Sequence, residues 1–571
     1  MVTRRAGSST ASATLLKLFA LLIALGLVAA ACGGGDGGGG DDAADSGGDP
    51  GDGAQDSIPE ETGEPVMGGE VVYGLEAETN GGYCLAEAQL AISGIQVAKT
   101  LYNTLTAPNA EGEIEPYLAE SVEPNEDFTQ WTITPREGVM FHDGTPLDAQ
   151  IIADNLNAYR GAFEGRSPLL FIFVLQDIAD VVATPENTVV VTTKRPWVAF
   201  PWILWSSSRM GIMGRAQLEA DDSECANNMI GTGPFKLESW TVNQELVAVK
   251  NPDYWEQDEF GNTLPYLDKI TYRPIPEVAQ RVNALESGQI DMMHLNDNEQ
   301  LADRLRPLAE TGDIDVVESD KFGEVVYLML NSSKPPFDNK NARLAVAHAL
   351  DREFLIDVRG GGIGEVANDP FAEDVVGSLG DEAGFPEFDI EKAKASAAKY
   401  EEETGSPLTF TYTFVTSEGG NLSAQEIQTQ MADAGIEMNI KPAGDQATTI
   451  NVAIAGEFQS VGWRNHPGAD PDTQYNWWHS GSPVNFGRIA DPEIDRLLDE
   501  GRTNPEGREE IYQDLSRRFA SEVYNVWLSR AIWAVGSVPG IKGVYGPTLP
   551  IGADFQGLGA GHFVHGIWLE G

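Results

Sequence analysis

The stretch that most constrains the fold is residues 231–293, where strand and helix patterns follow one another in a fixed order. Three short runs alternate apolar and polar side chains, which predicts strands. These runs are residues 235–237, 245–249 and 270–275. Residues 276–288 begin with proline, end with glycine and carry apolar residues at helical spacing, so they predict a helix. A strand at 290–293 completes a strand–helix–strand unit, expected to cross over right-handed onto a parallel neighbour.

Similar patterns extend the alternation of strands and helices toward the N-terminus. Residues 66–75 predict a first strand, and residues 85–105 carry apolar residues at helical spacing. Residues 128–134 alternate with period two between turn signals, which predicts a half-buried strand. A helix is expected next, with Thr145 as its N-cap and Pro146 in its first turn. Strands that alternate with helices predict an α/β fold.

Length and charge limit the size class and the partners. A chain of 571 residues with 42% apolar residues predicts two or three packed domains. Its 37 basic against 88 acidic residues give a formal charge of −51, which repels phosphate backbones and anionic headgroups. Nucleic acid is therefore not an expected partner. The acidity favours a solvated surface, with a specific cationic ligand as the alternative.

Residues 1–31 carry the pattern of an export signal: a basic start, an apolar run and small residues before Cys32. This junction resembles a bacterial lipoprotein signal, which implies cleavage and a lipid on Cys32. Residues 32–65 contain almost nothing to bury and predict a flexible tether rich in Gly and Asp. We expect an extracytoplasmic protein that contacts the bacterial cell membrane through its lipid anchor only.

Cysteine and histidine usage argues against metal or dithiol chemistry. With Cys32 assigned to lipid, Cys84 and Cys225 remain in polar, loop-like contexts. An oxidising compartment favours a disulfide between them, with two separate buried thiols as the alternative. No CxxC pair occurs, and no two histidines stand four residues apart as the zinc ligands of a helical HExxH motif do. We therefore predict no metal site and no cofactor.

The sequence also lacks the common catalytic motifs. No HExxH, GxSxG, Walker-type lysine loop or Rossmann glycine pattern after a strand is found. His142 stands beside a turn signal without an accompanying nucleophile. The aromatic patch at residues 197–205 favours packing between domains over a binding platform. No catalytic residue is predicted, and an extracellular hydrolase is only an alternative.

Several segments, in this order along the chain, carry a family resemblance. They are FHDGTPL at 141–147, GTGPF at 231–235, KNPDYW at 250–255, ALESGQID at 284–291, NSSKPP at 331–336, RLAVAHALDR at 343–352 and DPDT at 470–473. Together they resemble the extracytoplasmic solute-binding proteins of ABC transporters, in the family 5 that contains dipeptide-, oligopeptide-, nickel- and glutathione-binding members. The resemblance covers essentially all of residues 66–571.

The resemblance implies a two-lobed α/β clamp of the periplasmic-binding-protein-like type II, with an extra small domain inserted in lobe one. It implies a monomer that binds a small solute, a peptide or peptide-like molecule, and passes it to ABC permease subunits with their ATPases. Apolar, strand-like segments at 325–331 and 527–533 are expected to carry the crossings between lobes. The predicted parts are lobe one at 66–107, 220–325 and 532–571, the inserted domain at 108–219 and lobe two at 326–531.

The resemblance places a ligand-contacting loop directly after Val461 and Gly462, with Trp463 at its start. Peptide-binding members have an Asp three residues after this Trp, which neutralises the ammonium of the ligand. Here His466 stands at that place, or Pro467 if one residue is inserted. Neither is an acid, and a buried ammonium without a counter-ion costs several kcal/mol. A free peptide N-terminus is therefore expected only if Asp470 supplies the charge.

Other residues of this loop favour different ligand groups. Arg464 suits a carboxylate or another oxyanion, with a structural ion pair as the alternative. Trp463 offers a stacking face for an amide plane or a sugar ring, with core packing as the alternative. Trp477 is a further cleft candidate, again with packing as the alternative.

In lobe one the resemblance places a ligand loop after the first strand, and Glu78, Asn80 and Tyr83 are its candidates. A peptide or peptide-like solute is expected. Blocked peptides, acidic compounds and oligosaccharides remain alternatives, as does a surface sensor or adhesin without transport.

Overall fold

The computed structural model describes residues 63–79, 81–465, 468–544 and 557–570. The predicted signal and Cys32, and the candidates Asn80, His466 and Pro467, lie outside the described residues. In the described part of the chain, no helix combines the length and the apolar character that crossing a membrane requires.

The largest sheet has seven strands in the order β12-β18-β11-β1-β10-β9-β8. The central strand β1 runs parallel to β10 on one side and to β11 on the other. Helix α8 (Val278–Glu286) joins β10 to β11, so the predicted strand–helix–strand unit forms with β1 between its two strands. The strands are β1 (Glu70–Leu75), β8 (Phe235–Thr241), β9 (Glu245–Lys250), β10 (Lys269–Pro274), β11 (Met292–Leu295), β12 (Asp315–Ser319) and β18 (Trp533–Ser537).

The helix predicted at 85–105 is shorter in the structure. Helix α2 spans Ile92–Leu101, and nearly all of its residues are buried because it lies in the core beneath the seven-stranded sheet. The disulfide between Cys84 and Cys225, with an S–S distance of 2.02 Å, joins the turns before α2 to the short helix α7 (Asp222–Asn227).

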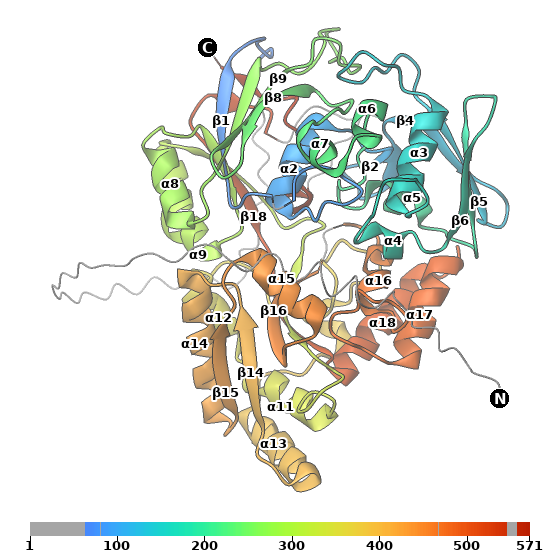
Figure 1. The fold of residues 1–571 in the computed structure, drawn as a ribbon. Coiled ribbons are helices and arrows are strands. Elements are labelled where there is room, and N and C mark those ends of the chain that lie inside the picture. The colour runs from blue at the N-terminus through green and yellow to red at the C-terminus, as the bar shows by residue number, and fades with distance from the viewer. Residues whose placement is uncertain (1–62, 80, 466–467, 545–556, 571) are drawn as a thin grey trace, which may run out of the picture. The chain divides into compact units, whose positions relative to one another are not determined.

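A second sheet has four antiparallel strands in the order β4-β5-β7-β6. Helix α3 (Ala149–Tyr159) packs against it (Figure 1). The N-cap of α3 is Asp148, whose side chain accepts a hydrogen bond from the Ile151 amide. The prediction of Thr145 as the cap was wrong, because Thr145 donates to Asp143 within the preceding turn. The strands are β4 (Ala119–Pro124), β5 (Gln130–Pro135), β6 (Ile178–Ala183) and β7 (Val189–Thr193).

A third sheet has five strands in the order β15-β14-β16-β13-β17. Its strands are β13 (Val325–Leu330), β14 (Thr409–Phe414), β15 (Glu437–Pro442), β16 (Ser460–Arg464) and β17 (Asn525–Arg530). Figure 1 shows its helices in yellow to red. The helices are α11 (Lys340–Ala349), α12 (Arg352–Arg359), α13 (Ile390–Thr404), α14 (Glu418–Asp433), α15 (Gln446–Ala455), α16 (Tyr475–Trp478), α17 (Pro492–Thr503) and α18 (Arg508–Glu522).

Smaller elements complete the described chain. They are β2 (Thr106–Pro108), β3 (Ile114–Pro116), α4 (Phe171–Val174), α5 (Phe200–Trp205), α6 (Arg215–Leu218), α9 (Asn298–Gln300), the π-helix η1 (Leu301–Leu305), α10 (Arg306–Thr311), the 3₁₀ helices η2 (Gly380–Ala383), η3 (Pro471–Gln474) and η4 (Leu558–Ala560), β19 (Ile541–Lys542) and β20 (Trp568–Leu569).

The chain passes between the seven-stranded and the five-stranded sheet twice. The first passage is residues 320–324, between β12 and β13, and the second is residues 531–532, between β17 and β18. The segments expected to cross, 325–331 and 527–533, mostly form strands of the sheets themselves. The two connections between the sheets are therefore shorter than the apolar segments that were predicted to form them.

Buried charges join the four-stranded region to the helices of the five-stranded sheet. Arg502 of α17 is fully buried and donates to both carboxylate oxygens of Asp472, at 2.8 and 3.1 Å, and to Asp177 beside β6, at 3.1 Å. Trp197 donates its indole N–H to Asp472 at 2.8 Å, and its ring covers the Arg502 guanidinium. The aromatic patch at 197–205 packs in both large cores, as packing between domains requires.

We expect Arg502→Met to destabilise the protein by about 3–5 kcal/mol, because it leaves Asp472 buried without its cation, whereas Asp177 keeps its ion pair with Arg195. Urea unfolding followed by circular dichroism measures the change. The control is Arg496→Met on the same helix, which removes ion pairs to Glu493 and Glu500 at the surface and should change stability little. Equal losses in the two variants would contradict a special role for the buried network.

Candidate functional site

Strand β16 carries the predicted ligand loop and lies beside β13. Trp463 is opposite Tyr327, and Arg464 is opposite Val326. Because side chains alternate along a strand, Val461 and Trp463 point to one side of the sheet and position 462 faces the other. A Cβ atom at Gly462 would come within 2.7 Å of the hydroxyl of Tyr412. A larger residue therefore does not fit at position 462 without displacing Tyr412.

A pocket lies on the Trp463 side of the five-stranded sheet. Its volume is about 10 Å³, which is room for about one water molecule. Phe486 makes edge-to-face contacts with both Trp463, at a centroid distance of 5.8 Å, and Trp477, at 5.5 Å. The lining residues are Tyr327, Met329, Trp463, Arg464, Asn465, Gln474, Trp477, Trp478, Phe486, Gly487, Ile489 and Asn525. Two of the predicted ligand residues, Trp463 and Trp477, thus meet at one cavity together with Arg464.

Arg464 forms an ion pair with Glu324, the last residue before β13, at 3.1 Å. Trp533 of β18 donates its indole N–H to the same carboxylate oxygen at 3.3 Å, and its ring lies 5.5 Å from the guanidinium. Burial raises the pKa of Glu324, and Arg464 opposes that shift. Apart from Glu324, the guanidinium has no hydrogen-bond partner among the described residues. Since a guanidinium carries five N–H donors, most of its donor capacity is open.

Asp470 and Asp472 are engaged within the protein. Arg508 binds both oxygens of Asp470, at 2.7 and 2.8 Å, and the Asp472 amide donates to one of them at 2.8 Å. Asp472 is held by Arg502 and Trp197. Asp470 could have replaced the missing Asp, but Arg508 already neutralises its charge.

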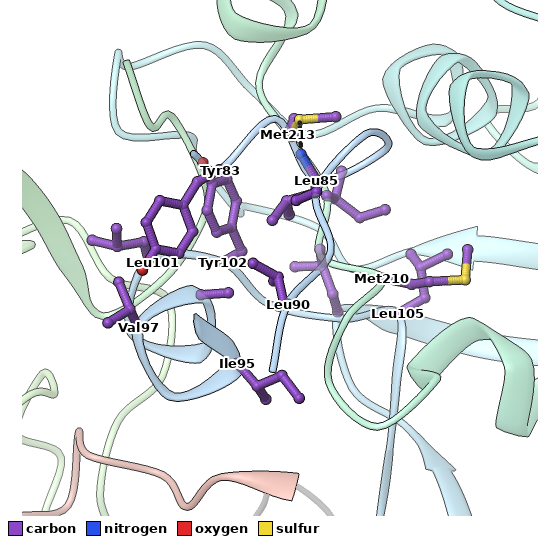
Figure 2. Close-up of a cluster of buried hydrophobic side chains, with 14 of the residues drawn as sticks. Tyr83, Leu85, Leu90, Ile95, Val97, Leu101, Tyr102, Leu105, Met210 and Met213 are labelled. Atoms are coloured by element: carbon purple, nitrogen blue, oxygen red, sulfur yellow. Dashed lines mark hydrogen bonds between the residues drawn. The ribbon is translucent and has the colours of Figure 1, made fainter. Parts of the chain in front are cut away.

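The candidates after β1 lie elsewhere. Tyr83 is 1% exposed and packs in a buried apolar cluster near Leu101 and Tyr102 (Figure 2). Glu78 accepts hydrogen bonds from the Thr79 amide at 2.8 Å and the Asn243 amide at 2.9 Å. Neither residue lines the pocket at Trp463.

Several residues of this site were not predicted from the sequence. They are Glu324, Tyr327, Met329, Phe486, Asn525 and Trp533. A signal existed for Glu324, because it is a lone acid directly before the apolar run at 325–330. An acid at the entrance of a buried strand requires a cationic partner. The remaining residues come from three separate segments, and nothing in the sequence brings those together.

No group of three or more His, Cys, Asp or Glu side chains is placed to hold a metal ion among the residues that the structure describes. The side chains gathered around the pocket are aromatic rings, an arginine and amides, which are groups that bind or orient a solute.

Comparison with known proteins decides the family. The sequence profile of the bacterial extracellular solute-binding proteins, family 5 Middle, matches residues 113–486. The chain belongs to this family. Its members are small-solute-binding proteins that work with ABC permeases, and the curated relatives that match are binding proteins rather than enzymes. Family 5 members of this kind are extracytoplasmic.

Two curated relatives and one solved structure illustrate the match. The nickel-binding periplasmic protein of Escherichia coli K12 is 27% identical over 80% of this chain and 88% of its own length. A probable D,D-dipeptide-binding periplasmic protein of the same strain, DdpA, is 26% identical over 76% of this chain and 83% of its own. The structure of AgaA from A. tumefaciens R10, in complex with agropinic acid, aligns with a TM-score of 0.76 at 24% identity, covering 88% of this chain and 99% of AgaA. The predicted α/β, two-lobed type II clamp is thereby confirmed.

Acid should destabilise the protein through His294, at the end of β11. Burial, with a contribution from nearby Arg281, lowers its pKa to about 3. Between the ordinary histidine pKa of about 6.5 and this value, only the unfolded state binds the proton, so stability falls as the pH falls below about 6.5. The share of His294 in the loss from pH 7 to pH 4.5 should be about 2–3 kcal/mol. Burial also lowers the pKa of His142 to about 4 and that of His562 to about 3, so His294→Gln should reduce the loss by the share of His294 without abolishing it.

Urea unfolding of wild type and His294→Gln at both pH values tests this prediction. His348→Gln, at the C-terminal end of α11, is the control and should keep the wild-type pH dependence. A His294→Gln protein with an unchanged pH dependence would contradict the prediction.

Proposed function

We propose that this chain is the lipid-anchored, substrate-binding component of an ABC importer. It captures a peptide or peptide-like solute by closure of two lobes and delivers it to the permease. Family membership and the two-lobed fold support capture and delivery. The sequence pattern before Cys32 supports the lipid anchor. In this proposal the lobes are the residue ranges predicted from the sequence, and the protein acts as a monomer.

The observation that carries the proposal is the guanidinium of Arg464. It lies at the end of β16, next to a passage between the two sheets, and its donors are open apart from the Glu324 contact. A carboxylate of the solute would receive paired N–H donors there, which is the geometry in which arginine binds carboxylates best. The charge of Arg464 is compensated before a solute arrives, because Glu324 contacts the guanidinium and Glu76 adds a further negative charge nearby.

The same residues argue against recognition of a free ammonium. Family members that bind peptides through the N-terminus rely on an acid in this loop, and here Asp470 and Asp472 are each held by an arginine. Releasing Asp470 would leave Arg508 without its ion-pair partner, and releasing Asp472 would leave Arg502 with Asp177 alone. We propose that the solute is recognised through its carboxylate and does not need a free N-terminus, so acidic and N-blocked molecules are included.

The peptide Ala-Ala-Phe, which contains no tryptophan, tests this by titration against the tryptophan fluorescence of the protein. N-acetylation should change the Kd less than about threefold, because no acid pairs with the ammonium. C-terminal amidation should weaken binding at least about tenfold, because a charged hydrogen bond to Arg464 is lost. In Arg464→Gln the effect of amidation should disappear.

The opposite pattern, a large loss on acetylation and none on amidation, would overturn carboxylate recognition. No saturable binding of any form would count against a peptide-like solute.

A further inference from the structure

A group of polar side chains joins the four-stranded region to the helices of the five-stranded sheet. They are Asp177, Arg195, Tyr475, Asp499 and Arg502, and we call them the latch. Resting on the proposed function, we propose that the latch holds the two lobes closed and parts reversibly when they open. The chain itself connects residues 325–530 to the rest only at the two passages between the sheets. Noncovalent contacts therefore decide how long the lobes stay closed.

The latch lies at the boundary between two apolar cores. The four-stranded and seven-stranded sheets share one core, which contains Val71 of β1 and Ile133 of β5. The five-stranded sheet has its own core, which contains Leu328 of β13. Close-packed cores resist deformation, so the four-stranded region should move with the seven-stranded sheet. Trp202 and Trp205 of α5 pack in the second core, and they add apolar contacts to the boundary.

Charged contacts of the latch cross this boundary in both directions. Arg195, which follows β7, forms an ion pair with Asp499 of α17. It also donates to the hydroxyl of Tyr475 in α16 at 2.6 Å. From the other side, Arg502 of α17 donates to Asp177 beside β6 at 3.1 Å. Opening of the lobes along this boundary must break these contacts.

Both arginines also have a carboxylate partner on their own side of the boundary. Arg195 binds Asp177 at 2.7 Å, and both belong to the four-stranded region. Arg502 binds Asp472 at 2.8 Å, and both belong to the five-stranded part. An arginine or aspartate that lost its only partner while buried would strongly destabilise the open form. Because each of these four charges keeps one partner, the latch can open without that penalty.

Water reaches the outer part of the latch. The side chains of Arg195 and Asp499 are 28% and 43% exposed, whereas that of Arg502 is fully buried. Water can hydrate Arg195 and Asp499 as they separate, and solvent screening makes their ion pair moderate in strength. A much stronger latch would make the open form, which admits the solute, too rare for binding.

One backbone hydrogen bond reports directly on the boundary. The amide of Val198 donates to the carbonyl oxygen of Arg502 at 2.9 Å. We expect hydrogen exchange of this amide to require opening of the boundary. The amides of β7 bond within the four-stranded sheet and serve as an internal reference. Hydrogen–deuterium exchange of the whole protein, followed by mass spectrometry of the peptide that contains Val198, therefore measures the opening.

Asp499→Asn tests the latch without disturbing the other pairs. It removes the charge that faces Arg195 across the boundary, while Arg195 keeps Asp177. We expect the amide of Val198 to exchange about three- to tenfold faster than in wild type, with the β7 amides unchanged. Unchanged β7 amides show that the four-stranded region is still folded.

Two further variants separate the latch from a general effect of charge. Tyr475→Phe keeps every charge and the ring but removes the hydroxyl between Arg195 and Asp499, so it should accelerate exchange less than Asp499→Asn. Glu500→Gln, on the same helix, removes a similarly exposed acid whose ion pair with Arg496 stays within α17. It should exchange like wild type.

Release of a solute distinguishes a latch from a local contact. N-acetyl-Ala-Ala-Phe is bound to each variant, and its dissociation rate is followed by tryptophan fluorescence after dilution. A solute held between lobes leaves through the open form, so Asp499→Asn should release the peptide about three- to tenfold faster than wild type. Loosening of a purely local contact would not change the release.

Each outcome bears on one proposal or the other. Equal exchange at Val198 in Asp499→Asn and wild type would overturn the latch, as would the same acceleration in Glu500→Gln. Faster exchange with unchanged release would also overturn it, because the contact would not govern the lobes. Absence of saturable peptide binding would count against the proposed peptide-like solute, whereas the exchange rates would still decide for or against the latch.

Discussion

The described part of the segment after β16 depends on two arginines, the buried Arg502 and the half-buried Arg508. Arg508 binds Asp470 through two hydrogen bonds, and Arg502 binds Asp472 in the same way while also reaching Asp177. Paired hydrogen bonds between ions are strong and directional, so they fix the path of the loop against α17 and α18. Because Asp470 and Asp472 are both bound to these arginines, neither offers a negative charge to a solute. What faces the solute is Arg464, balanced by Glu324.

The ion pair between Arg464 and Glu324 also contacts both connections between the two sheets. Glu324 belongs to the passage between β12 and β13, and Trp533, which donates to it, begins β18 directly after the other passage. A negatively charged group of the solute that binds Arg464 would weaken the ion pair between Arg464 and Glu324. It would thereby change a contact of the segments that connect the two sheets. In the proposed function, binding and closure of the lobes would then be linked through the carboxylate of Glu324, since a ligand shifts a conformational equilibrium only by contacts that differ between the states.

The sequence was sufficient for the family, the α/β class and most strands, because period-two and helical patterns and the family blocks are local signals. It failed where tertiary contacts override local ones. Thr145 is a good capping residue, but Asp148 caps α3. The helix expected at 85–105 shortens to α2, where burial on all sides removes the usual distinction between faces.

The site was predictable only in part. Trp463, Trp477 and Arg464 could be found because they belong to one stretch of the sequence, from β16 to α16, and all three line one pocket. Asn525 and Phe486 could not, since they reach the cavity from other segments and resemble ordinary core residues in the sequence. The engagement of Asp470 by Arg508 was equally hidden, because the two residues are 38 positions apart and each looks like a surface charge.

In the proposed function, this protein captures a small solute between lobes and performs no chemistry on it. Native mass spectrometry of the protein purified without denaturation, before and after incubation with an extract of growth medium, measures what it binds. We expect one bound small molecule per chain, anionic and chemically unchanged on release by unfolding. A protein that acquires no small molecule, or that releases a cleaved or modified one, would contradict it.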